Sequence, residues 1–125
     1  MAKRIFTSFA IEDERMRDLF VGQARKENVP YELVGMSVKE PWSDSWKTRC
    51  RSRIKGCNGV VVLITEHLKQ ADGAIWEIKC AKEENIPLIG VYIGNATAAN
   101  APAELNGVRK INWTWAGIAS FVNGL

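Results

Sequence analysis

Apolar residues are gathered along the chain into short runs of the kind that form buried strands. GVVVLIT (residues 59–65) and IPLIGVYI (residues 86–93) are apolar without alternation, a pattern typical of parallel strands covered on both faces. RIFTSFA (residues 4–10) is dense in β-branched and aromatic residues, and YELVGM (residues 31–36) and VRKI (residues 108–111) are shorter runs. The pattern therefore predicts five strands.

The segments between these runs carry apolar residues at helical spacing. The stripes consist of Met16, Leu19, Phe20 and Ala24; of Trp46, Cys50, Ile54 and Cys57; of Ala74, Ile75, Ile78 and Ala81; and of Trp115, Ile118, Phe121 and Val122. Ser43 and Asp44 precede the second stripe and Asn112 precedes the fourth, and residues of these types cap helix N-termini. The chain is therefore predicted to alternate between strand and helix.

This alternation, without an internal repeat or a linker, predicts a single α/β domain over residues 1–125. We expect a doubly wound, flavodoxin-like parallel sheet of five strands in the order 2-1-3-4-5, with helices on both faces. In that order the topology switches between strands one and three, and ligands bind at the C-terminal ends of these strands. Residues 8–14 and 65–77 are therefore the segments in which a site is expected.

Glu77 is the most informative polar residue of these segments. On a helical wheel centred on Ile78 it lies about 100° away, on the border of the apolar stripe. This position predicts a carboxylate that is neither fully buried nor fully exposed, and partial burial would raise its pKa. The periodicity alone favours the alternative, a solvated glutamate in the first turns of the helix that the helix dipole stabilises.

Trp76 and Cys80 fall nearly opposite this stripe, so both are expected at the surface. A surface tryptophan is typical of a pocket rim or a protein interface. Packing of Trp76 beneath a neighbouring loop is the alternative.

Charge and cysteine content restrict the class of protein further. The net charge of +3 is mild, and the basic residues at every second position from Lys47 to Lys55 fall on both sides of a helix, so a nucleic-acid partner is not expected. Three cysteines without a CxxC pair and a single histidine, His67, support neither a disulfide framework nor a metal site. The N-terminal stretch IFTSFAI is too short for a signal peptide or a membrane span, so we expect a cytoplasmic protein without membrane contact.

The sequence lacks the motifs of several common nucleotide-binding, hydrolytic and phosphotransfer sites. GxGxxG does not follow the first strand, no GxxxxGK[ST] occurs, and nothing pairs His67 with Ser8 or a cysteine for nucleophilic hydrolysis. The acidic residues 12–14 and Lys110 resemble those of response-regulator receiver domains, but strand three is followed by no phospho-accepting aspartate. Residues 12–14 are then more simply charges at a helix N-terminus.

Four segments resemble a known family in their order and spacing. KRIFTSFAIEDE, SVKEPWSDSW, GVVVLITEH and WEIKCAKEENIPLIGVY lie within residues 3–93 and resemble the small bacterial and archaeal TIR-like domains, which include the B component of Thoeris antiphage defence systems. FTSF (residues 6–9) matches the end of the first TIR strand, and residues 37–46 match the loop after the second.

The resemblance implies an enzyme that cleaves NAD at the nicotinamide–ribose bond and makes an ADP-ribose-derived, cyclic signal for a separate effector protein. Glu77 matches the glutamate that catalytic members require on the helix after strand three. The positions implied to bind the nucleotide or to wall its cleft are Phe6, Ser8, Trp42, Trp46 and Trp76. NAD is then the substrate, no metal is required, and self-association or an activating partner is expected.

The chain departs from many catalytic members just before this glutamate. It has Asp72, Gly73 and Ala74 where those members carry tryptophan or cysteine. A second hypothesis therefore stays open, in which the domain is a non-catalytic module that binds other proteins through residues 37–46 and the surface around Trp76.

Overall fold

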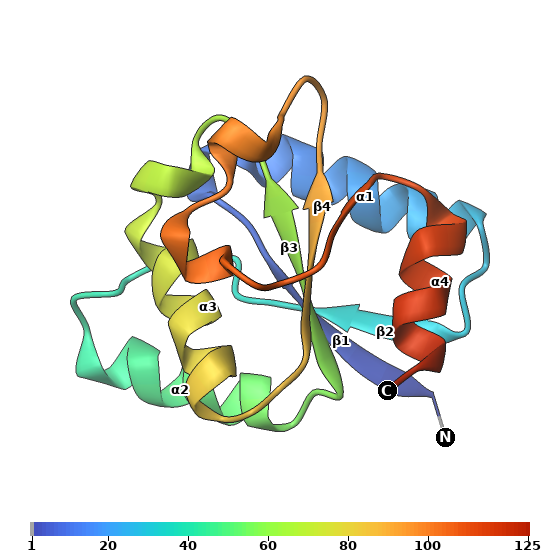
Figure 1. Cartoon of the computed structure of the whole chain (residues 1–125). Coiled ribbons are helices and arrows are strands. Elements are labelled where there is room, and N and C mark those ends of the chain that lie inside the picture. Colours follow the sequence, from blue (N-terminus) through green and yellow to red (C-terminus); the bar gives the residue numbers. More distant parts are fainter. Residues whose placement is uncertain (1) are drawn as a thin grey trace.

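A five-stranded parallel sheet forms the centre of the computed structural model, which describes residues 2–125 (Figure 1). The strands are β1 (Lys3–Ser8), β2 (Tyr31–Val34), β3 (Gly59–Ile64), β4 (Leu88–Tyr92) and β5 (Lys110–Asn112). Their order is β2-β1-β3-β4-β5, and every neighbouring pair is parallel. The predicted flavodoxin-like fold and strand order are thus confirmed.

The sheet is covered by helices on both faces. They are α1 (Glu14–Lys26), α2 (Asp44–Lys55), α3 (Asp72–Glu83) and α4 (Trp115–Asn123). Short 3₁₀ turns lie in the connections, at Ile11–Asp13, Leu68–Gln70, Ala98–Asn100 and Ala103–Leu105. Figure 1 shows α2 and α3 on one side of the sheet and α1 and α4 on the other. None of the helices in residues 2–125 combines the length and the apolar character needed to cross a bilayer.

Two apolar cores follow from the alternation of side chains along the strands. In β1, Phe6 joins the core beneath α2 and α3, whereas Ile5 joins the core beneath α1 and α4. All six residues of β3 are buried, as expected for a strand covered on both faces. The polar residues Thr7 and Ser8, at the end of β1, consequently point to opposite faces of the sheet.

The predicted helix caps and the predicted apolar stripe of α1 are only partly confirmed. Ser43 caps α2, because its side chain accepts a hydrogen bond from the backbone N–H of Trp46. Asn112 does not cap α4, because it is the last residue of β5, and Thr114 takes that role. Leu19 was expected in the buried stripe of α1 but is 48% exposed, since the stripe follows Phe20 and Ala24 at a spacing of four residues.

The neighbours Phe20 and Leu19 provide a matched test of this packing. Phe20 is fully buried between the sheet and the rings of Trp113 and Trp115, with centroid separations of 5.6 and 5.0 Å. We expect Phe20→Ala to lower the free energy of unfolding by about 3–5 kcal/mol. Leu19→Ala should change it by less than about 1 kcal/mol, because half of this side chain is already in water. Urea denaturation followed by tryptophan fluorescence measures both values, and equal losses would contradict the burial of Phe20.

Candidate functional site

Glu77 is completely buried in the core between the sheet and helices α2 and α3. Its expected position on the border of the stripe is therefore wrong, and so is the alternative of a solvated glutamate. Cys80 is also fully buried rather than at the surface, and Trp76 is half-buried. The reason is that α3 packs against α2 as well as against the sheet, so its buried surface is wider than one stripe.

Polar groups from three other segments converge on the Glu77 carboxylate. Ser8, the last residue of β1, donates its hydroxyl hydrogen to Oε1 at 2.8 Å. Lys39, from the loop after β2, donates from Nζ to Oε2 at 2.7 Å, and the thiol of Cys50 in α2 lies 3.8 Å from Oε2. Both carboxylate oxygens thus have partners, as a buried carboxylate requires.

Complete burial raises the pKa of Glu77 above its ordinary value, although Lys39 and the hydrogen bonds from Ser8 and Cys50 act against this shift. Burial, with the nearby Glu77 carboxylate, also raises the pKa of Cys50, so this thiol remains a protonated donor. Burial raises the pKa of Cys80 to about 11, so that thiol is protonated as well. A perturbed carboxyl group with dedicated partners is typical of functional sites.

The loop between β2 and α2, residues 35–43, closes over this carboxylate. Arg53 of α2 donates a hydrogen bond to the carbonyl oxygen of Gly35 at 2.7 Å, and the indole N–H of Trp46 donates to that of Val38 at 2.6 Å. The Lys39 side chain, only 4% exposed, reaches inward so that Nζ lies 4.2 Å from the centroid of the Phe9 ring. With the loop in this position the carboxylate of Glu77 has no access to solvent.

The six residues expected at the site do not all come together. Ser8 contacts Glu77, and Phe6 lies in the same core. Trp46 is fully buried and packs edge-on against Trp76, with ring centroids 5.4 Å apart.

Trp42 lies outside this closed arrangement, where it is 76% exposed. Together with Pro41, Ile75 and Trp76 it lines an open surface hollow of about 380 Å³. Trp76 therefore connects the two regions, since it contacts the buried Trp46 on one side and lines the hollow on the other.

Three residues of the site were missed by the sequence analysis. Phe9 belongs to the FTSF stretch, and its second aromatic position was a usable signal. Lys39 lies within the loop that was singled out, but no periodic pattern says which loop side chain turns inward. Cys50 was assigned to the core, and only the tertiary structure places its thiol beside a carboxylate.

A separate polar cluster lies where β3 ends and α1 begins. The Thr65 hydroxyl donates a hydrogen bond to Asp13, and the ring nitrogen Nδ1 of His67 lies 2.9 Å from Asp13 Oδ1. The hydrogen bond and charge of Asp13 raise the pKa of His67. Asp13 is buried, so it is not simply one of the helix-terminal charges that the sequence suggested. Among residues 2–125, no three His, Cys, Asp or Glu side chains are placed to hold a metal ion.

A family model described as "Thoeris protein ThsB, TIR-like domain" matches residues 5–98. The chain belongs to this family. Within the matched range of the ThsB TIR-like domain lie Ser8, the loop with Lys39, and Glu77. A search of curated proteins found no match to the sequence.

Solved structures of low sequence identity share the fold of this ThsB TIR-like domain. The SEFIR domain of IL-17 receptor B is 12% identical, with a TM-score of 0.62 over 98% of this chain and 93% of that one. A prokaryotic SEFIR domain is 14% identical, with a TM-score of 0.55 over 98% of this chain and 89% of that one. At such identities the similarity establishes the fold alone.

The ion pair between Lys39 and Glu77 makes a pH-dependent prediction. The folded-state pKa of Glu77 is raised above 4.5, so the contribution of this group to stability is greatest below about pH 4.5 and declines as the pH rises through the folded-state pKa. Lys39→Met removes the cation that most strongly opposes this shift and leaves a buried carboxylate without a positive partner. We expect a loss of about 3–5 kcal/mol at pH 7, and a smaller loss in acid, where Glu77 is protonated.

Urea denaturation at several pH values from about 4 to 8 measures this difference. Lys69→Met, at an exposed lysine, is the control and should change stability little at any pH. A loss for Lys39→Met that is the same at both ends of the pH range would contradict a stabilising contact with a charged Glu77.

Proposed function

We propose that this protein is an NAD-processing enzyme of Thoeris antiphage defence, in which Glu77 is the catalytic carboxylate. The observation that carries the proposal is the buried Glu77, held by Ser8 and Lys39 at the C-terminal end of β1. This is the end of the sheet where ligands bind in doubly wound folds. Membership in the ThsB family supports the assignment, because the glutamate lies within the matched range.

The reaction needs few polar groups from the protein. The nicotinamide of NAD is a good leaving group, and its departure leaves positive charge on the ribose, as in glycoside cleavage. A carboxylate at Glu77 stabilises this charge and accepts hydrogen bonds from the ribose hydroxyls. Ser8 holds one carboxylate oxygen in place, and the Phe9 ring supplies a face that already binds a cation.

The present arrangement is a closed state of this enzyme. Glu77 is fully buried, and the Lys39 ammonium takes the position beside the carboxylate where positive charge would develop during the reaction. NAD therefore reaches Glu77 only after residues 35–43 move. Self-association or a partner protein that binds this loop would provide the activating step.

The fate of the ribosyl group depends on the shape of the open site. If water is admitted, ADP-ribose is formed. If water is excluded, another nucleophile of the same molecule captures the ribose and a cyclic product results. We propose the cyclic product, acting as a signal for a separate effector protein.

Glu77→Gln tests the catalytic role. Purified protein is incubated with NAD in lysate from phage-infected cells, which supplies activating factors, and nicotinamide and the products are followed by mass spectrometry. We expect the variant to release nicotinamide at least about 10²-fold more slowly, because it loses the charge that stabilises the transition state.

Glu27→Gln is the matched control, since this glutamate is exposed at the end of α1 and should leave turnover unchanged. Equal rates for the Glu77 variant and the original protein would overturn the role of Glu77. Absence of NAD cleavage by the original protein in the infected lysate would overturn the enzymatic proposal itself.

A second candidate function, self-association through the loop, rests on its exposed apolar side chains. Val38 is 60% exposed and Trp42 is 76% exposed, and Trp42 borders the hollow beside Trp76. Interfaces are enriched in tryptophan, and burial of such a side chain gives much of the binding free energy.

Trp42→Ser should therefore weaken self-association of the protein at least tenfold, as measured by sedimentation velocity over a range of concentrations. Ile11→Ser provides a control, because Ile11 is 42% exposed but lies outside this loop. If both variants associate as the original chain does, the loop is not the contact surface.

A further inference from the structure

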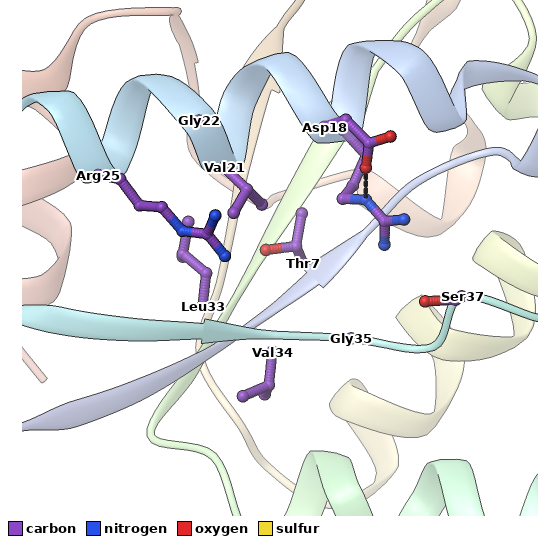
Figure 2. A pocket seen from close by; sticks show the side chains of 10 residues that line it. Thr7, Asp18, Val21, Gly22, Arg25, Leu33, Val34, Gly35 and Ser37 are labelled. Atoms are coloured by element: carbon purple, nitrogen blue, oxygen red, sulfur yellow. Dashed lines mark hydrogen bonds and ion pairs between the residues drawn. The ribbon is translucent and has the colours of Figure 1, made fainter.

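A groove lies between helix α1 and strand β2, on the face of the sheet opposite Glu77. It consists of two adjoining hollows of about 380 and 470 Å³, which share Val21, Arg25 and Leu33 in their linings. Figure 2 shows Val21 and Arg25 projecting from α1 toward β2, with Thr7 between the helix and the strand.

Two residues that line the groove each carry a buried hydroxyl group with no hydrogen-bond partner within residues 2–125. The hydroxyl oxygens are Oγ1 of Thr7, a residue that is 2% exposed and lines the first hollow, and Oη of Tyr31, a residue that is 8% exposed and lines the second. Buried polar groups without partners are uncommon in folded proteins, because each loses its bonds to water without replacement. The third such group in the described residues, the indole N–H of Trp113, does not line the groove, whereas Thr7 and Tyr31 both do, so a molecule bound there would lie beside both residues.

Gly22 keeps the wall of the groove open. It lies in the middle of α1 and lines the first hollow, and a Cβ atom added there would meet no atom within 4 Å. Glycine destabilises the interior of a helix relative to alanine, and the packing around Gly22 does not require it. A larger side chain at this position would project into the open space.

Arg25 is the charged residue that lines both hollows, while Asp18 and Glu32, which line one hollow each, are paired with Arg17 and Arg4. The guanidinium group of Arg25 makes no hydrogen bond or ion pair within the described part of the chain. Arg17, by contrast, is bonded to Asp18 at 2.8 Å and lies over the Phe9 ring. Burial raises the pKa of Tyr31, so its hydroxyl stays protonated and able to donate. Arg25 and Thr7 offer hydrogen-bond donors to an acceptor in the first hollow.

We propose that this groove binds a small molecule carrying an oxyanion, with Arg25 pairing with the negative charge and the hydroxyl of Thr7 donating a hydrogen bond to one of its oxygens. The arginine fork suits phosphate and carboxylate groups alike. The site is separate from Glu77, because Thr7 and Ser8 point to opposite faces of the sheet.

Isothermal titration calorimetry of the full chain at low ionic strength tests this proposal, with sodium pyrophosphate as the phosphate and sodium citrate as the carboxylate. We expect saturable binding of at least one of them at one site per chain. Arg25→Gln should weaken it at least tenfold. Arg15→Gln removes the same charge from an exposed position of α1 outside the groove and should leave the affinity unchanged.

Two further variants test the groove without changing its charge. Gly22→Leu should abolish binding, because leucine fills the open wall while it also favours the helix. Thr7→Val, which keeps the shape of the side chain, should weaken binding several-fold. Glu77→Gln should still bind the probe saturably at one site per chain, which separates this site from the proposed catalytic one.

The binding of only one probe would identify the class of oxyanion. Absence of saturable binding for both pyrophosphate and citrate would overturn the proposal. So would an equal loss of affinity for the variants at Arg15 and Arg25, because binding would then follow net charge rather than this groove, or unchanged binding by Gly22→Leu.

Discussion

The burial of the Glu77 carboxylate is the constraint on which the surrounding structure depends. A charged carboxylate deep in an apolar core costs several kcal/mol unless a cation and hydrogen-bond donors accompany it. The fold provides them from three directions, through Ser8 at the end of β1, Cys50 in α2 and Lys39 in the loop after β2. Since Lys39 is the only cation among them, the carboxylate and the closed position of the loop stabilise one another.

Under the proposed function, Lys39 in the closed state occupies the place that the reacting ribose would take. The ammonium group of Lys39 lies between the carboxylate of Glu77 and the ring of Phe9. An anion and an aromatic face are also suited to the positive charge that develops when nicotinamide leaves NAD. When the loop opens, the positively charged ribose would replace the Lys39 ammonium beside Glu77. The carboxylate would then have a positive partner during the reaction as well as in the closed state.

Much of the fold could be predicted from local patterns, because the strands and helices differ in the period of their apolar residues. The unbroken apolar run of β3 and the cap at Ser43 are examples in which neighbouring residues decide the outcome. The burial of Glu77 and Cys80 could not be predicted in this way. A helical wheel treats a helix as packed on one side, whereas α3 is covered by both the sheet and α2.

The surroundings of Glu77 were predictable to the extent that they follow from the topology. The switch point predicted a site at the end of β1 and the start of α3, and the Ser8 hydroxyl at the end of β1 donates a hydrogen bond to Glu77 of α3. The inward turn of Lys39 depends on contacts made by residues distant in sequence, including the Gly35–Arg53 bond. Similarly, the hydroxyls of Thr7 and Tyr31 give no sign in the sequence that they lack partners.

The two sides of the sheet are linked through the same loop. Gly35 and Ser37, near its start, line the groove beside α1, and a Cβ atom on Gly35 would lie 3.0 Å from the carbonyl oxygen of Thr7. Lys39, a little further along, holds the carboxylate of Glu77. An occupant of the groove that contacts the start of the loop differently in its open and closed positions would bias access to Glu77. Linkage then requires that opening at Glu77 alter the affinity of the groove by the same factor.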